Sequence, residues 1–236
     1  MTQADPTINQ VLDGFMLVQR KRLSVSSARR YEEILGYFRS CMDGYGHQWL
    51  SDEEAELFNR EYGRDEEKGS FCNLFGPEKI LENLDDFLGW FLVRKTMVSK
   101  STLQPVPTIL RKFIYWMVEQ GHVTADAADG SAELLDEAGS LAKAQEFSRR
   151  LYDAVEEGPI DSLIEDQDWE NEMAVISRVA QAKVSFQNEE SGYELSLDVP
   201  EDVAKLAEPG WRISALHLAR TSKGWCLLEM GNVYPI

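Results

Sequence analysis

The chain is poor in several features, and each shortage excludes a class of protein. It has only three cysteines and three histidines in 236 residues, and neither set has the spacing of a disulfide framework or a zinc site. It lacks any run of about 18 apolar residues, so we expect no membrane-spanning helix. Its first ten residues lack the basic and apolar pattern of a secretory signal. We therefore expect a cytoplasmic protein with reduced thiols and without metal or cofactor.

Positive charge is also scarce. The chain has 24 Lys and Arg against 41 Asp and Glu, a formal net charge of −17, which disfavours nucleic acid as a partner. The charge is uneven, because residues 1–120 sum to −3, residues 121–170 to −11 and residues 171–236 to −3. Two clusters hold most cations of the first segment, and residues 94–112 contain no acid. The clusters are Arg20, Lys21, Arg22, Arg29, Arg30 and Arg39, and Arg94, Lys95, Lys100, Arg111 and Lys112.

Apolar residues recur at three- and four-residue spacing through the first half of the chain. This pattern predicts four main helices. They cover about 7–18, 26–42, 77–92 and 101–120. Ser24 or Ser26 can cap the second helix, and Pro105 and Pro107 should kink or delay the fourth.

The second half changes character twice. Residues 126–173 are rich in Ala and acids and predict an acidic helical connector, with one long helix at about 131–157. From about residue 174 the apolar residues alternate, which indicates four or five short strands. Residues 174–236 therefore predict a small β-barrel of SH3-like or OB-like size. The fold class expected is α+β with two domains joined by the connector.

Several short motifs of the helical half occur in a familiar order. They are Leu12–Leu17, Arg22–Ser24, Ser27–Tyr31, Leu35–Phe38, Leu84–Leu88, Ser101–Leu103 and Leu110–Trp116. In this order, residues 8–125 resemble the SAM-like, core-binding domain that precedes the catalytic domain of tyrosine recombinases, the phage integrases. The resemblance implies a domain over 1–125, built of four helices packed as two crossed hairpins. It also implies a clamp on the DNA backbone, with a link to recombination or mobile elements.

The same resemblance implies a set of phosphate contacts on duplex DNA. By position these are Lys21, Arg22, Ser24, Arg29, Arg30, Lys100, Ser101 and Arg111. The chain departs from the family in an acidic insert at residues 43–76, which is longer than the usual link between these helices. Within the insert, Ser51 and Glu54 form a capping box that should start a short helix reaching about Tyr62.

We expect residues 1–236 to lack the catalytic half of such a recombinase. His217–Arg220 superficially resembles a His-x-x-Arg box, and Tyr234 follows it. Transition-state stabilisation needs several cationic groups preorganised around the phosphate, whereas residues 171–236 predict strands rather than the large helical domain that would hold them. We expect no enzyme activity and no catalytic residue, with His217 a surface or edge histidine.

Two functions remain open. The first is a non-catalytic DNA-binding protein, which the acid-free stretch 94–112 and the Arg and Lys run at 20–30 favour. The alternative is a protein-interaction adaptor that keeps the SAM-like fold without DNA binding, which the net charge favours. Its protein partner would bind the acidic connector or the barrel. Trp169, an indole in a very polar stretch, is the candidate partner-binding residue.

Overall fold

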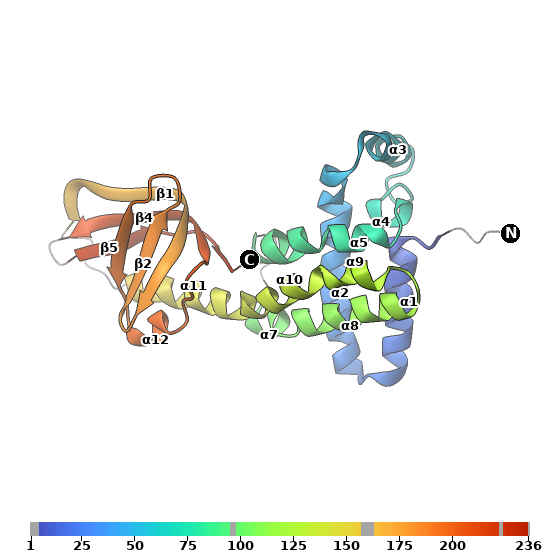
Figure 1. Cartoon of the computed structure of the whole chain (residues 1–236), viewed down its shortest axis with the longest axis horizontal. Coiled ribbons are helices and arrows are strands. Elements are labelled where there is room, and N and C mark those ends of the chain that lie inside the picture. Colours follow the sequence, from blue (N-terminus) through green and yellow to red (C-terminus); the bar gives the residue numbers. More distant parts are fainter. Residues whose placement is uncertain (1–4, 95–97, 157–162, 222–223, 236) are drawn as a thin grey trace. The chain divides into compact units, whose positions relative to one another are not determined.

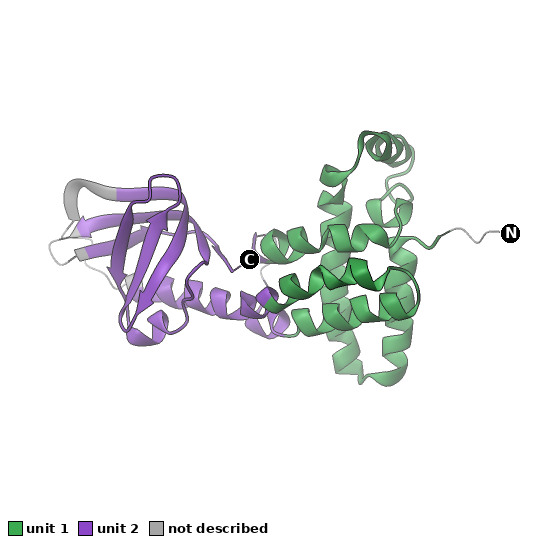
Figure 2. Ribbon diagram, in the orientation of Figure 1, with its two compact units in different colours: residues 1–92, 105–136 green, residues 93–104, 137–236 purple. Residues whose placement is uncertain are grey.

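The computed structural model describes residues 5–94, 98–156, 163–221 and 224–235. It divides into two compact units (Figure 2). The helical unit comprises residues 1–92 and 105–136, and the β unit comprises residues 93–104 and 137–236. The expected α+β class is confirmed, with helices in the N-terminal region and an antiparallel sheet at the C-terminus (Figure 1).

The helical unit begins with a hairpin of two long helices. Helix α1 (Ile8–Arg22) is followed after one turn by α2 (Val25–Tyr45), so both are longer than predicted. The Ser24 hydroxyl accepts from the Ser27 backbone N–H at 3.3 Å, which confirms Ser24 as the cap of α2. The other elements of this unit are η1 (Gly46–Trp49), α3 (Asp52–Tyr62), α4 (Phe71–Leu74), α5 (Glu78–Glu82), η2 (Asp86–Phe91), α8 (Val106–Glu119), α9 (Ala125–Asp129) and α10 (Ser131–Glu137).

Fully buried phenylalanines join the main helices of this unit. Phe15 of α1 lies 5.1 Å, ring to ring, from Phe113 of α8, and Phe38 of α2 stacks at 4.6 Å on Phe87 of η2. Element η2 is a π-helical stretch within the predicted third helix. Truncation of such a buried ring to Ala costs about 3–5 kcal/mol, so these contacts fix how the four helices pack.

The insert at 43–76 is part of this core rather than a detached acidic loop. Its capping box at Ser51 and its helix α3 form as predicted. Phe71 and Cys72 of α4 are fully buried, and the Cys72 backbone N–H donates to Asp43 Oδ1 at 2.9 Å. A Cβ at Gly46 would stand 2.9 Å from the Phe71 ring, so this close approach requires glycine.

The β unit is a curled antiparallel sheet that forms a half-barrel. Its strand order is β3-β2-β1-β4-β5, with β6 paired to β4, and the edge strands β3 and β5 approach each other. The strands are β1 (Leu163–Ala180), β2 (Lys183–Asn188), β3 (Glu194–Asp198), β4 (Arg212–Thr221), β5 (Gly224–Glu229) and β6 (Val233–Tyr234). The short helix α12 (Glu201–Ala204) lies between β3 and β4.

The β structure starts earlier than about residue 174, because β1 begins at Leu163. The stretch 163–172 is so rich in acids and amides that it lacks the apolar alternation by which a strand is recognised. Hydrogen bonding to β4 makes it a strand, with Trp169 opposite Leu218.

The predicted acidic connector is not a separate element. Its helices α9 and α10 belong to the helical unit, whereas α11 (Leu141–Glu156) belongs to the β unit, with the one turn η3 (Ala138–Ser140) between them. Phe147 and Leu151 of α11 are fully buried in one cluster with the apolar residues of the sheet. An amphipathic helix buries its apolar stripe on whatever surface completes its core, and here that surface is the sheet.

Two short helices of the β unit come from the middle of the chain. They are α6 (Leu92–Arg94), whose first residue still belongs to the helical unit, and α7 (Lys100–Leu103). Pro105 ends this stretch and caps α8, so the prolines delay the fourth main helix as predicted. Helix α7 packs on α11, and Gln145 donates to the Val98 carbonyl at 2.6 Å.

Candidate nucleic-acid interface

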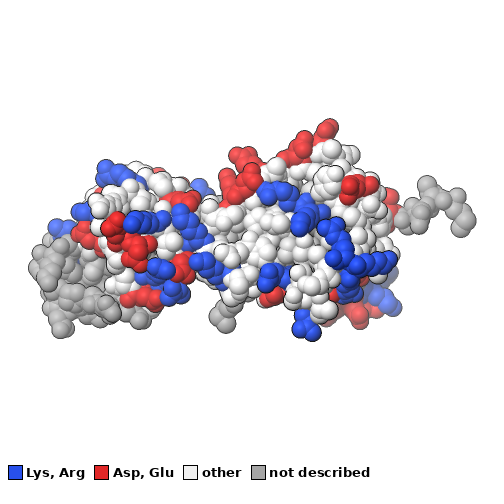
Figure 3. All heavy atoms as spheres, turned by 90° about the horizontal axis from the view of Figure 1, so that it is seen from below, with Lys and Arg blue, Asp and Glu red and all other residues white. Residues whose placement is uncertain are grey.

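The tip of the α1–α2 hairpin carries four cations at the positions predicted to contact phosphate. Lys21 and Arg22 end α1, and Arg29 and Arg30 lie in the second turn of α2, with Ser24 between the two pairs. All four cations are exposed, and none of them has an ion pair within the part of the chain that the structure describes. We call these four residues the hairpin cations. Figure 3 shows Lys and Arg side chains in a band across the helical unit.

Neighbouring cations of the same helices are neutralised locally. Arg20 of α1 pairs with Glu32 of α2 at 2.7 Å, and Arg39 of α2 pairs with Asp13 of α1 at 2.8 Å. These two pairs link α1 to α2 across the surface of the hairpin. The hairpin cations differ from Arg20 and Arg39 because no carboxylate of the described residues pairs with them.

A groove runs between α1 and α8 of the helical unit. It has a volume of about 750 Å³. Its lining includes Val18, Gln19, Arg22, Arg111, Lys112 and Tyr115. We call it the α1–α8 groove. It brings together Arg22 and Arg111, two of the predicted phosphate contacts, and adds Lys112, whose Nζ donates to the Tyr31 hydroxyl at 3.3 Å.

Arg111 already has an acidic neighbour. Its guanidinium pairs with Asp136 of α10 at 2.5 Å, and both side chains are more than half exposed. An exposed pair of this kind contributes only about 0–1 kcal/mol, so Arg111 can exchange Asp136 for another anion. The acidic stretch after residue 125 thus meets one predicted phosphate contact directly.

Lys100 and Ser101 do not belong with the other predicted contacts. They lie in α7, which is part of the β unit, and the Lys100 charge acts on Glu146 of α11. Leu103 of the same helix is buried. The structure therefore divides the second basic stretch between two units. The division depends on the tertiary packing of α7 on α11, which local sequence does not show.

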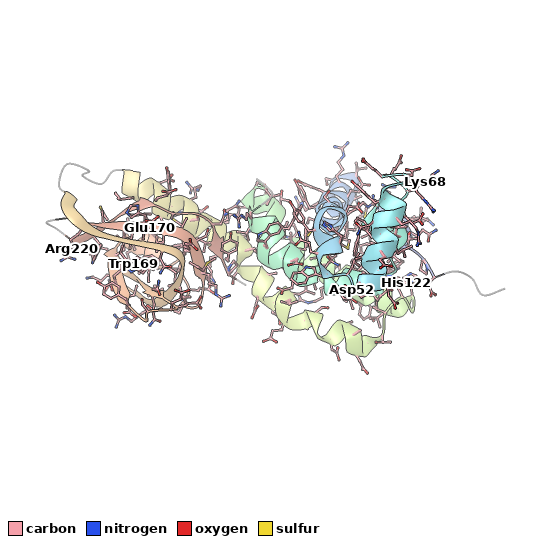
Figure 4. All side chains as sticks on the ribbon, turned by 90° about the horizontal axis from the view of Figure 1, so that it is seen from above. Asp52, Lys68, His122, Trp169, Glu170 and Arg220 are labelled. Carbon is pink, nitrogen blue, oxygen red and sulfur yellow. The ribbon has the colours of Figure 1, made fainter. Side chains whose placement is uncertain are left out.

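Trp169 lies on strand β1, not on a helical connector. Its indole is half-buried and packs against the hydrophobic cluster of the β unit. Figure 4 shows Trp169, Glu170 and Arg220 on the sheet of this unit. The placement explains why an indole occurs in so polar a segment, since alternate residues of the strand face the core.

His217 is not an edge residue. It lies on β4, which pairs with β1 on one side and β5 on the other, and it stands opposite Glu170 and Glu229. Arg220 of the same strand lies over the Trp225 ring at 5.5 Å, and Tyr234 is buried on β6. His217, Arg220 and Tyr234 are therefore all strand residues of the half-barrel.

The thiols and acids of the described residues offer no second site. Burial raises the pKa of the Cys41 thiol to about 12 and also raises the pKa of Cys72, so neither is primed as a nucleophile. No group of three or more His, Cys, Asp or Glu side chains in the described ranges is arranged to hold a metal ion. Nor does any helix found there combine the length and apolar character needed to cross a membrane.

One groove residue was missed by the sequence reasoning. Gln19 continues the apolar stripe of Ile8, Leu12 and Phe15 at four- and three-residue spacing, and it is buried like them. A polar residue in an apolar stripe is the signal that could have identified it.

These features define a two-unit α+β protein whose helical unit presents unpaired cations beside a groove. Comparison of the chain with protein-family models, with curated proteins and with solved structures finds no match.

Proposed function

We propose that this chain is a non-catalytic DNA-binding protein that holds duplex DNA through its helical unit. In this proposal the four main helices form a SAM-like pair of crossed hairpins. The hairpin cations, together with Arg111, contact the phosphate backbone, and Ser24 adds a hydroxyl. Lys100 and Ser101 are left out, because they belong to the β unit. Trp169 remains a candidate for binding a protein partner through its exposed part.

The hairpin cations are the observation that supports this proposal most directly. Four exposed Lys and Arg side chains, without a partner acid among the described residues, lie at the tip of the α1–α2 hairpin in a chain with a net charge of −17. In so acidic a protein most cations find a carboxylate, as Arg20 and Arg39 do. Each phosphate that such a cation neutralises releases counterions and so favours binding.

The alternative function is a protein-interaction adaptor whose cations bind an acidic partner. The Arg111–Asp136 pair favours the adaptor, because it shows Arg111 of the groove bound to a protein carboxylate. A carboxylate-bearing protein would use the same hairpin cations, so salt dependence alone does not separate the two functions. What separates them is whether the salt-dependent partner is duplex DNA.

The test measures binding of the full chain to a fluorescent duplex of about 20 base pairs between about 50 and 200 mM salt. Arg29→Ala with Arg30→Ala should lower the slope of log K against log salt by about 1.8, at about 0.9 per phosphate contact. The control is Arg60→Ala with Arg64→Ala, which removes the same charge from residues that both pair with Glu61. The proposal fails if wild type shows no salt-dependent binding, or if both double variants behave alike.

A further inference from the structure

The α1–α8 groove contains a buried acceptor that backbone contacts to DNA do not explain. Gln19 is 3% exposed, and its Oε1 has no hydrogen-bond partner among the described residues. It lines the groove. The Oε1 atom is closed off from solvent and finds no donor among the described residues. A buried polar group without a partner is destabilising, so a turn of the Gln19 amide toward an N–H or O–H donor in the groove is favoured.

The outer wall of the groove is aromatic and apolar. Tyr115 of α8 is 65% exposed and Val18 of α1 is 40% exposed, and both line the groove. Trp116 beside them is held in place by ring contacts with Phe15 and His122. The exposed ring of Tyr115 at the mouth of the groove is suited to stacking on a planar ring.

The charges at the groove are mostly positive. Arg22 and Lys112 have no ion pair among the described residues, Arg111 is held by Asp136, and Glu119 is the acid among the lining residues. The groove therefore offers a cation for a phosphate, a stacking surface and a buried acceptor. Its volume of about 750 Å³ lies within the range of small-molecule pockets.

We propose that the α1–α8 groove binds one unpaired nucleotide of DNA, which makes the protein selective for DNA with a single-stranded end or gap. The phosphate contacts Arg22 and Lys112, the base stacks on Tyr115 and Val18, and an N–H of the base donates to Gln19 Oε1. This inference rests on the proposed function and adds the kind of DNA that is preferred. A side-chain carboxylate of a protein partner would satisfy the cations but has no donor for Gln19.

The test compares three DNA probes on the full chain by fluorescence anisotropy at one salt concentration. The probes are a blunt hairpin duplex, the same duplex with a short dC tail, and the same duplex with an abasic tail of equal length. The abasic tail carries the same phosphates, so only the base differs between the two tails. We expect the dC tail to bind at least about fivefold more tightly than the abasic tail, as a stacked base provides.

Two variants place the effect in the groove. Tyr115→Ala removes the stacking surface and should abolish the preference for the dC tail. Gln19→Leu removes the acceptor and should reduce it. Tyr152→Ala is the control, because Tyr152 is also a half-exposed tyrosine on a helix but lies on α11 of the β unit. Thermal unfolding checks that each variant is folded.

Each result separates the groove from the proposed function. Equal binding of the two tails, together with salt-dependent binding of the blunt duplex, overturns the nucleotide site and leaves the DNA-binding function. Absence of binding to all three probes overturns both. A tail preference that survives both Tyr115→Ala and Gln19→Leu overturns the assignment to this groove. If the base makes no difference and an Asp- and Glu-rich peptide binds wild type but not Tyr115→Ala, the groove is a peptide site and the inference is wrong.

Discussion

Single charged side chains of this protein fall into two groups, those with a structural partner and those without. Lys79 is the clearest of the first group, because it is buried and contacts Glu54 at 3.0 Å and Glu82 at 2.8 Å. Burial lowers the pKa of Lys79, but the hydrogen bonds that Lys79 donates to Glu82 and Glu54 outweigh it, so the net shift is upward. Lys79 thereby ties α3 of the insert to α5.

Removal of the Lys79 charge should destabilise the helical unit. Lys79→Met should lower the free energy of unfolding by about 1–2 kcal/mol, because the half-buried Glu54 and the more exposed Glu82 would lose their shared cation. Lys68→Met makes the same change at an exposed residue that pairs with Asp65 at 3.5 Å, and should cost under about 0.5 kcal/mol. Urea unfolding followed by circular dichroism measures both. An equal decrease in the free energy of unfolding for the two variants would show that the Lys79 contacts do not stabilise the unit.

Among the elements, helix α11 stabilises the β unit through both of its sides. Its apolar side completes the hydrophobic cluster of the half-barrel. Its polar side is fixed by Glu146, which accepts from Arg149 at 3.0 Å and from Arg150 at 2.6 Å, while Arg150 also donates to Asp202 of α12 at 2.9 Å. Hydrogen bonds from Arg150 and then Arg149 hold the pKa of Glu146 at about 2.

The low pKa of Glu146 predicts a pH dependence of stability. Because the carboxylate is favoured in the folded state, its contribution is present above the unfolded pKa and is lost as pH falls toward about 2. Glu146→Gln should lower stability at neutral pH by about 1 kcal/mol and flatten the decline below about pH 4.5. Glu133→Gln on α10 is the control. Thermal unfolding between neutral pH and pH 2 compares them, and identical curves for wild type and Glu146→Gln would refute the prediction.

On the scale of the whole molecule, the excess of negative charge opposes the proposed binding of DNA. The acidic residues of the insert stand in the same unit as the hairpin cations. Deleting the run 51–68 would remove Phe58, which is buried and stacks on His47. Neutralisation of exposed carboxylates is therefore the way to change charge without changing the fold.

Loss of acidic charge should tighten DNA binding at low salt. The combined change Asp52→Asn, Glu53→Gln, Glu66→Gln and Glu67→Gln removes four exposed negative charges of the insert. Affinity for duplex should rise about two- to threefold near 50 mM salt, and the gain should disappear above about 200 mM as screening shortens the Debye length. The same anisotropy titration measures it. A gain that is independent of salt would rule out an electrostatic origin.

Much of the helical unit could be predicted because its signals are local. The spacing of apolar residues and the caps at Ser24 and Ser51 place α1, α2 and α3. The π-helical stretch η2 could not be predicted, since its sequence fits an ordinary helical stripe. The start of β1 at Leu163 was missed because pairing with β4, rather than apolar alternation, makes that acidic segment a strand.

The candidate site was predictable in part for the same reason. The run from Lys21 to Arg30 is short, so its cations could be expected near one another where two predicted helices meet. That Lys100 packs with a different unit depends on the burial of Leu103, a tertiary contact. Gln19 was overlooked because one amide among the apolar residues of a helix is common and does not by itself indicate a site. The SAM-like arrangement stays a prediction.

The division of the chain also has a consequence for its synthesis. The chain passes between the units after Leu92, Gln104 and Asp136, so the short segment 93–104 is made long before the rest of its unit. Its side chains Val98 and Leu103 are buried in the folded protein and stay exposed until α11, which ends at Glu156, has been made. At about 5–20 residues per second, a ribosome needs roughly 2–10 s to reach that point. During this interval the helical unit can fold while segment 93–104 still exposes apolar side chains. A chaperone can bind that segment until α11 covers it.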